Sequence, residues 1–140
     1  MSERLCRQWA VMLAAFWWGG LLLLMAVVVP LLFKHAPTPA IAGSLAAKLF
    51  SAQAWLAQLC GVLVMVLGLE RLTRQPYAWF RAGFVWVILA MLMALLVEFA
   101  VAPRILARDN LRLWHTLGST MLLGQLVATG RLLWQWSARS

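Results

Sequence analysis

Four long apolar stretches without charged residues constrain this chain more than any other feature. The first two comprise 26 residues between Arg7 and Lys34 and 21 residues between Lys48 and Glu70. A helix needs roughly 20 predominantly apolar residues to cross the hydrocarbon core of a bilayer. Both stretches are therefore predicted to be transmembrane helices.

The other two stretches are shorter. The third has 16 uncharged residues, 82–97, and reaches a spanning length only if it continues through Glu98 to Ala102, just before Pro103. The fourth, 113–130, has 18 uncharged residues. We place Glu98 inside the third span, because a helix that ended before it would be too short for a bilayer.

The predicted fold class is all-α: a polytopic membrane protein with a four-transmembrane-helix bundle, short loops and both termini on the same side. Helices are favoured over a membrane β-barrel because the sequence lacks alternating segments of about ten residues. Residues 1–140 are predicted to form a single domain, since this length leaves no room for a separate soluble one. The spans are predicted at approximately 9–33, 47–69, 82–102 and 113–133.

Composition and charge exclude other classes of protein. Hydrophobic residues make up 64% of the chain and charged residues 11%, against roughly 45–50% and about 25% in soluble domains. The net charge is +8, but the basic residues are spread between apolar blocks and form no patch suited to a nucleic acid. The lipid bilayer is therefore the expected partner. A second copy of the chain or another membrane protein is a further candidate.

Basic residues also predict the orientation. Seven lysines and arginines lie in the two terminal segments and the loop after the second span, and five lie in the other two loops. Because such residues favour the cytoplasmic side, both termini are predicted to be cytoplasmic. Tryptophans near the span ends are predicted to anchor the helices at the lipid–water interface: Trp9, Trp79, Trp114, Trp134 and Trp136.

Two local patterns concern the helix ends. Thr38 followed by Pro39 is typical of a helix start, which predicts that the second helix begins near Ala40. Residues 28–32 resemble residues 101–105, with their prolines 73 positions apart. This spacing is consistent with two helical hairpins related by an axis along the membrane normal. Two unrelated helix ends would give the same local signal.

Polar residues inside the spans fall on faces that predict a common site. On the fourth helix His115, Ser119, Gln125 and Thr129 share an arc of about 120°, and Glu98 lies on the Gly/Ala face of the third. An ionisable residue within a span is costly and usually functional. We therefore predict a polar cluster in the outer half of the bundle, formed by Glu98, His115, Ser119 and Gln53, with His35, Arg104, Arg108 and Arg112 around its mouth.

The role of this cluster stays open at this point. Glu98 and His115 either bind a ligand, proton or metal, or hold the helices in register by a hydrogen bond or by pairing with Arg112. Contact with a lipid headgroup is a third interpretation. His35 and His115 are the candidate metal or haem ligands, but the sequence has no CxxC or HExxH spacing. No cofactor is predicted, and haem or copper is an alternative.

Several short motifs resemble a known family of small four-helix membrane proteins. They are Trp18-Gly19-Gly20, Val29-Pro30-Leu31-Leu32-Phe33, Ala42-Gly43, Phe50, Pro103 and Trp114-His115. In this order they resemble the family named after human transmembrane protein 205, which also covers the bacterial domain of unknown function 4149. That family usually has a serine one turn after the histidine, where this chain has Gly118 and Ser119. The resemblance implies no biochemical activity.

The Trp-Gly-Gly motif also resembles copper-resistance D-like proteins and the small four-helix protoporphyrinogen oxidases, which bind haem. Their first-helix histidines are missing here, since no histidine precedes His35.

The function predicted from these observations is ligand binding in a membrane. The sequence has no Ser/His/Asp set, Walker loop or Rossmann fingerprint, so a non-enzymatic role is favoured. We expect an integral protein of a bacterial inner membrane that binds a small ligand or cation at the polar cluster, in connection with transport or stress tolerance. The alternatives are an accessory subunit whose Gly/Ala faces dock another membrane protein, and a haem- or copper-binding redox protein.

Overall fold

The computed structural model describes residues 2–69, 76–107 and 110–138, and this part of the chain is helical without a strand. The predicted all-α class is therefore confirmed. The elements in chain order are α1 (Glu3–Leu23), the π-helical turn η1 (Leu24–Val28), α2 (Val29–His35), α3 (Pro39–Gly68), α4 (Ala78–Leu96), the π-helical turn η2 (Val97–Val101), α5 (Ala102–Leu106) and α6 (Leu111–Ser137).

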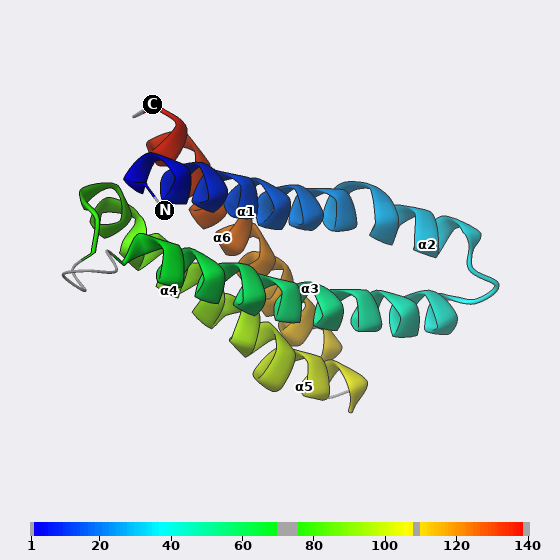
Figure 1. The fold of residues 1–140 in the computed structure, drawn as a ribbon. Helices are drawn as coiled ribbons and strands as arrows, with labels where there is room; N and C mark the ends of the chain where they lie inside the picture. The colour runs from blue at the N-terminus through cyan, green and yellow to red at the C-terminus, as the bar shows by residue number, and fades with distance from the viewer. Residues whose placement is uncertain (1, 70–75, 108–109, 139–140) are drawn as a thin grey trace.

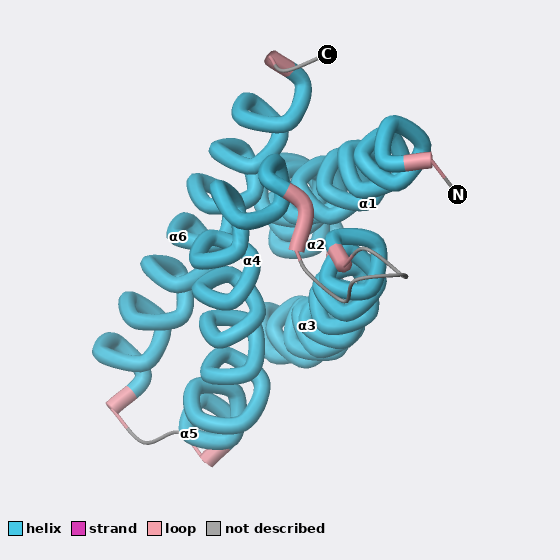
Figure 2. Tube along the Cα trace, turned by 60° about the vertical axis from the view of Figure 1, so that its left-hand side comes forward, coloured by secondary structure: helices cyan, strands magenta, loops and turns pink. Residues whose placement is uncertain are grey.

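The helices form four columns arranged as two hairpins (Figure 1). In the first hairpin α1, η1 and α2 run antiparallel to α3, and in the second α4, η2 and α5 run antiparallel to α6. α1 packs against α3 and α6, and α4 packs against the same two helices, so the columns close into a four-membered ring (Figure 2). The two ends of the chain lie at the same end of the bundle, and the hairpins diverge toward the other end.

Polar side chains define where three of the helices begin. Ser2, Thr38 and Asn110 each accept a hydrogen bond from the backbone N–H three residues further on. Such caps satisfy N–H groups that the helix itself leaves unpaired. α3 begins at Pro39 directly after Thr38, which confirms the predicted helix start to within one residue.

The columns that contain π-helical turns bury equivalent positions. The turns η1 and η2 lie 73 residues apart, as do Pro30 and Pro103. Unrelated helix ends would not share a whole burial pattern, so the structure favours a repeat over coincidence. The buried pairs at this spacing are Cys6 and Trp79, Ala10 and Gly83, Ala14 and Val87, Trp17 and Ala90, Leu21 and Ala94, and Leu24 and Val97.

The other two columns repeat in the same way with a spacing of 72 residues. The most informative pair is Gln53 of α3 and Gln125 of α6, because both are buried polar residues at matching positions. The remaining buried pairs are Ala46 and Gly118, Ala57 and Thr129, Cys60 and Leu132, and Val64 and Trp136. The two hairpins therefore share one packing plan, and differences between them single out positions with a special role.

Large side chains of one helix fill the space above glycines of the next. A Cβ atom at Gly83 would lie 2.7 Å from the Trp136 ring, and one at Gly61 would collide with Met91. Small residues let membrane helices approach closely. The Gly/Ala faces therefore pack against neighbouring helices inside the bundle.

Three columns are long and apolar enough to cross a membrane: Glu3–His35, Pro39–Gly68 and Ala78–Leu106. α6 is not among them, because histidine, glutamine, threonine and arginine recur along it and lower its hydropathy. The described chain is therefore a membrane-embedded helical bundle. The predicted fourth span, 113–133, lies within α6 and is not established by length and composition.

The tryptophans near the helix ends divide into two groups. Trp9 and Trp134 are 54% and 71% exposed, as interfacial anchors should be. Trp79 and Trp136 are only 4% and 1% exposed. Their rings meet edge to face with centroids 5.3 Å apart, and Trp136 Nε1 donates a 3.1 Å hydrogen bond to the backbone oxygen of Trp79. The prediction that these two act as anchors is wrong, because they close the core where the helices converge.

Candidate functional site

A pocket of about 250 Å³ lies where the two hairpins diverge, and we name it the interhairpin pocket. Its polar side chains are Ser51, Glu98, His115 and Ser119. The rest of its wall comes from all four columns and is apolar, and it includes the aromatic side chains of Phe33 and Phe50. Polar groups of a few kinds in an otherwise apolar wall are typical of a small-molecule site.

Glu98 is the central polar residue of this pocket. It is half-buried in η2, and its Oε1 accepts a 2.7 Å hydrogen bond from Ser51 Oγ of α3. This distance is at the upper end of the range for a hydroxyl that donates to a carboxylate, about 2.5–2.7 Å. The bond holds the carboxyl group at the wall of the pocket.

The π-helical turn explains how Glu98 is presented. A π-helical turn widens the backbone by using i→i+5 hydrogen bonds, and such turns occur often at functional sites. η2 covers Val97–Val101, so Glu98 is its second residue. Pro103 follows within a turn and lacks an N–H group, which interrupts the regular helix ladder.

His115 and Ser119 lie one turn apart in the first half of α6 and line the same pocket as Glu98. Both are exposed, whereas Gln125 and Thr129 further along α6 are fully buried. Thr129 Oγ1 donates a 2.7 Å hydrogen bond to the backbone oxygen of Gln125. The polar face of α6 therefore points into the bundle only where the hairpins touch, and it borders an open pocket where they diverge.

Gln53 does not join this cluster. It is 9% exposed and borders a groove between α1 and α3, next to Gly20. Two residues along a helix correspond to about 200° of rotation, so Ser51 and Gln53 cannot face the same pocket. The expectation that Gln53 shares the site with Glu98 is wrong. Ser51, and not Gln53, is the residue of α3 that joins Glu98 in the pocket. The sequence could have indicated this, because Ser51 carries a hydroxyl group at the depth of Glu98 on a neighbouring antiparallel helix.

The predicted mouth residues lie in different surroundings. Arg104 of α5 stacks 4.8 Å above the Trp114 ring, beside the pocket. Arg112 is exposed in the first turn of α6 and does not line the pocket. Arg108 lies outside the described residues. Of the two predicted mouth arginines that the structure describes, Arg104 is therefore the one that lies beside the pocket, where it contacts Trp114.

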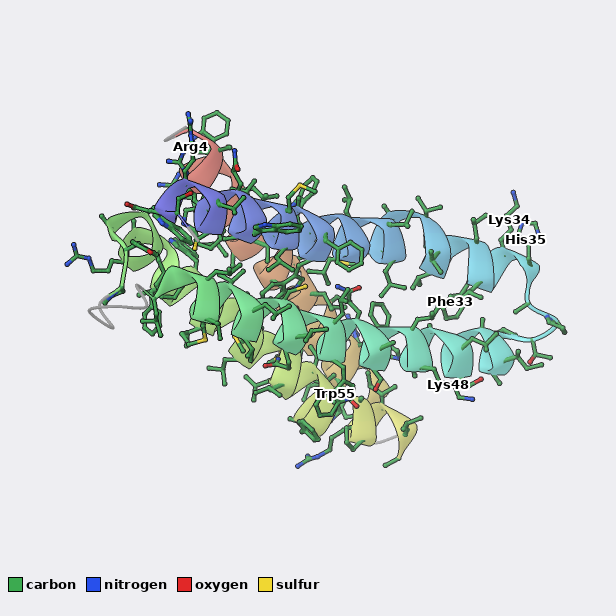
Figure 3. All side chains as sticks on the ribbon, in the orientation of Figure 1. Arg4, Phe33, Lys34, His35, Lys48 and Trp55 are labelled. Carbon is green, nitrogen blue, oxygen red and sulfur yellow. The ribbon has the colours of Figure 1, made fainter. Side chains whose placement is uncertain are left out.

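His35 lies far from the position that the sequence suggested. It projects at the end of α2 together with Lys34, while Phe33 points between α2 and α3 (Figure 3). It borders a different depression, with Ile41 and Leu45. Within the ranges that the structure describes, no three His, Cys, Asp or Glu side chains are grouped to hold a metal ion. His35 and His115 border different depressions, and their role as metal or haem ligands stays a prediction.

Comparison with known proteins gives a family. A family model described as "Domain of unknown function (DUF4149)" matches residues 12–113, well over half of the chain. No curated protein and no solved structure matches the chain. The match covers η1, η2 and Glu98 and ends within the first turn of α6. The match supports the resemblance to the bacterial domain of unknown function 4149. The link to the family of human transmembrane protein 205 stays a prediction. The chain belongs to the DUF4149 family.

Proposed function

We propose that this membrane protein binds a small amphipathic molecule in the interhairpin pocket, with Glu98 as the polar anchor for a cationic or hydrogen-bond-donating group. The observation that carries this proposal is the Glu98 carboxyl group, which is held at the pocket wall by Ser51. Ser119 and His115 of α6 supply further polar groups to the same pocket. The apolar side chains hold the remainder of the molecule.

The dimensions of the pocket support a small ligand. Its volume of about 250 Å³ lies just below the range of roughly 300–1,000 Å³ that is usual for small-molecule sites. A single ring or a short branched chain with one polar group has a suitable size. The half-buried carboxyl group favours a ligand that carries a positive charge or an N–H donor, because either compensates for the loss of water around the carboxylate.

Comparison of the two hairpins argues against a purely structural role for Glu98. Residue 25, which lies 73 positions before Glu98, is a methionine in the corresponding turn η1. A π-helical turn therefore forms at this point of the fold without a carboxyl group. Since the turn does not need Glu98, the cost of an ionisable residue in this segment is better explained by ligand binding.

We further propose that the protein lies in a bacterial inner membrane, that all four columns cross this membrane and that both termini are cytoplasmic. The 27 residues of α6 are long enough to cross, and its contacts with α1 and α4 support its insertion alongside them. The basic residues Arg4, Arg7 and Arg131 near the terminal end of the bundle favour this orientation. The interhairpin pocket then faces the outer half of the membrane.

The accessory-subunit alternative has less support. It relied on Gly/Ala faces that dock another membrane protein, but Gly61 and Gly83 pack against Met91 and Trp136 inside the bundle. No contact in the described chain favours the haem or copper alternative over the ligand proposed here.

The decisive experiment measures the melting temperature of the detergent-purified protein with benzylamine, which is cationic and donates hydrogen bonds, and with ethylbenzene, its neutral analogue of similar size. At about ten times its Kd, benzylamine is expected to raise the melting temperature by roughly 3–6 °C. Ethylbenzene is expected to give a much smaller shift, because it has neither a positive charge nor an N–H group to interact with the carboxyl group.

The matched variants are Glu98→Gln and Glu3→Gln. Glu98→Gln keeps an oxygen that accepts the Ser51 hydrogen bond, so the fold is expected to remain while the benzylamine shift disappears. Glu3→Gln removes the same charge in the first turn of α1, away from the pocket, and should keep the full shift. An equal benzylamine shift in wild type and Glu98→Gln would contradict the proposed function.

A further inference from the structure

A second pocket lies at the opposite end of the bundle, where the chain begins and ends. It has a volume of about 290 Å³ and is lined by Glu3, Arg4 and Arg7 of α1 and by Trp79 of α4. We name it the terminal pocket. Unlike the interhairpin pocket, it is bordered mainly by charged side chains.

Trp79 contributes an unusual feature to the terminal pocket. The residue is 4% exposed, and its indole Nε1 has no hydrogen-bond acceptor among the described residues. Trp136 Nε1 donates a hydrogen bond to the backbone oxygen of Trp79 and the two rings pack edge to face, while the Trp79 N–H group itself has no acceptor in the described part of the chain. A buried donor without an acceptor is destabilising. Because Trp79 lines the terminal pocket, a ligand oxygen that displaces the side chains covering this N–H group would provide the missing acceptor.

The charges around the terminal pocket indicate the kind of ligand. Two arginines against one glutamate leave a net charge of +1. The pocket is also at the N-terminal end of α1, a helix of 21 residues whose dipole favours an anion there. Arginine presents planar N–H donors that match phosphate oxygens in pairs. These properties fit a singly charged phosphodiester better than a doubly charged free phosphate.

The depth of the terminal pocket indicates the source of that phosphodiester. Trp9 lies two residues beyond Arg7 on α1, and Trp134 lies in the last turns of α6; both side chains are largely exposed. Exposed tryptophans mark the level of the lipid headgroups. The terminal pocket is therefore at the level where phospholipids carry their phosphate.

We propose that the terminal pocket binds the phosphodiester headgroup of an anionic phospholipid. The phosphate oxygens accept hydrogen bonds from Arg4 and Arg7 and from the indole N–H of Trp79. Glu3 limits the pocket to a single negative charge. This site is separate from the interhairpin pocket and does not depend on the function proposed for it.

The test measures binding of phosphatidylglycerol to the purified wild-type protein by native mass spectrometry. Phosphatidylcholine serves as the zwitterionic comparison, and glycerophosphoglycerol and inorganic phosphate serve as soluble ones. We expect phosphatidylglycerol to bind at least tenfold more tightly than any of the three. Equal binding of phosphatidylcholine would overturn the anionic assignment. Equal binding of inorganic phosphate or glycerophosphoglycerol would overturn the assignment to a lipid.

Variants then locate the binding site. The Arg4→Gln/Arg7→Gln variant is expected to bind phosphatidylglycerol at least tenfold more weakly, and Trp79→Phe, which keeps a ring but removes the N–H group, about threefold to tenfold more weakly. Arg4→Lys/Arg7→Lys keeps the charge and should lie between the first variant and wild type.

Matched controls complete the design. Arg81→Gln/Arg131→Gln removes two exposed arginines from the same end of the bundle, and Trp134→Phe removes an exposed indole N–H group. Both are expected to keep wild-type binding. An equal loss of affinity in Arg81→Gln/Arg131→Gln and in Arg4→Gln/Arg7→Gln would show general attraction to a basic surface, and the proposed site would be wrong.

Discussion

Ser51 Oγ lies 2.7 Å from Glu98 Oε1, and this hydrogen bond links the two hairpins at the wall of the interhairpin pocket. Ser51 belongs to α3 of the first hairpin, and Glu98 belongs to η2 of the second. The bond forms just where the hairpins begin to separate. It therefore fixes both the position of the carboxyl group and the width of the pocket at that level.

Replacing Ser51 by alanine is expected to lower the free energy of unfolding by about 1 kcal/mol, which is the usual size of such a bond between membrane helices. A double-mutant cycle with Glu98→Ala, which removes the acceptor, should give a coupling free energy of similar size, measured by unfolding in mixed detergent. Ser44→Ala is the control, because its hydroxyl donates a hydrogen bond to the backbone oxygen of Ile41 within its own helix. A coupling free energy near zero would show that the bond contributes nothing to the association of the hairpins.

Gln53 provides a test of which polar residues belong to the site. Its Nε2 is buried without a partner among the described residues, so Gln53→Leu is expected to leave the protein as stable as wild type or more stable by up to about 1 kcal/mol. The benzylamine shift should be unchanged, since Gln53 faces the groove beside Gly20. Loss of that shift in a folded Gln53→Leu protein would mean that the groove beside Gly20 is coupled to the interhairpin pocket.

Much of the fold was predictable because the bilayer imposes a simple rule on sequence. Uncharged length indicated the first two columns, and the third once the apolar run was extended through Glu98. The Thr38–Pro39 cap located the start of α3 to within one residue. The two π-helical turns were not predictable in the same way. Their sequences, Leu24–Val28 and Val97–Val101, are apolar apart from Glu98 and carry no signal for a π-helical turn, and only the prolines that follow hinted at a disturbance.

Part of the candidate site was also predictable. Depth and helical periodicity brought Glu98, His115 and Ser119 to one pocket. The same reasoning misplaced Gln53, because its face of α3 at that depth borders the groove beside Gly20 and not the interhairpin pocket. It misplaced His35 as well, because the turn that joins α2 to α3 lies far from α5 and α6 (Figure 1). The angle between the two hairpins depends on tertiary packing, so it cannot be predicted from the pattern of any one helix.

Gly83 and Gly19 give a matched test of the helix packing. A Cβ atom at Gly83 would lie 2.7–2.8 Å from Trp136 and Leu132, whereas one at Gly19 would meet nothing within 4 Å. Gly83→Ala is therefore expected to lower the free energy of unfolding by about 1–3 kcal/mol through overpacking. Gly19→Ala should be neutral or stabilising by up to about 1 kcal/mol, because alanine favours helix more than glycine does. Equal effects of the two substitutions would contradict the close approach of α4 and α6.

The number of membrane crossings is tested by two matched cysteine variants. Both ends of the chain lie at one end of the bundle, and the turn before α3 lies at the other (Figure 1). If α6 crosses the membrane with the other three columns, residues at these two ends face opposite compartments. Ala40→Cys and Ala138→Cys are suitable because both positions are exposed, and the native Cys6 and Cys60 are buried and can be replaced by alanine.

A membrane-impermeant maleimide is expected to label Ala40→Cys in intact bacterial cells whose outer membrane has been permeabilised. Ala138→Cys should be labelled only after the inner membrane is disrupted as well. Labelling of both variants before that step would mean that α6 does not share the orientation of the bundle. The reverse pattern would place the termini outside, and the interhairpin pocket would then face the cytoplasmic half of the membrane, where a ligand would reach it from within the cell.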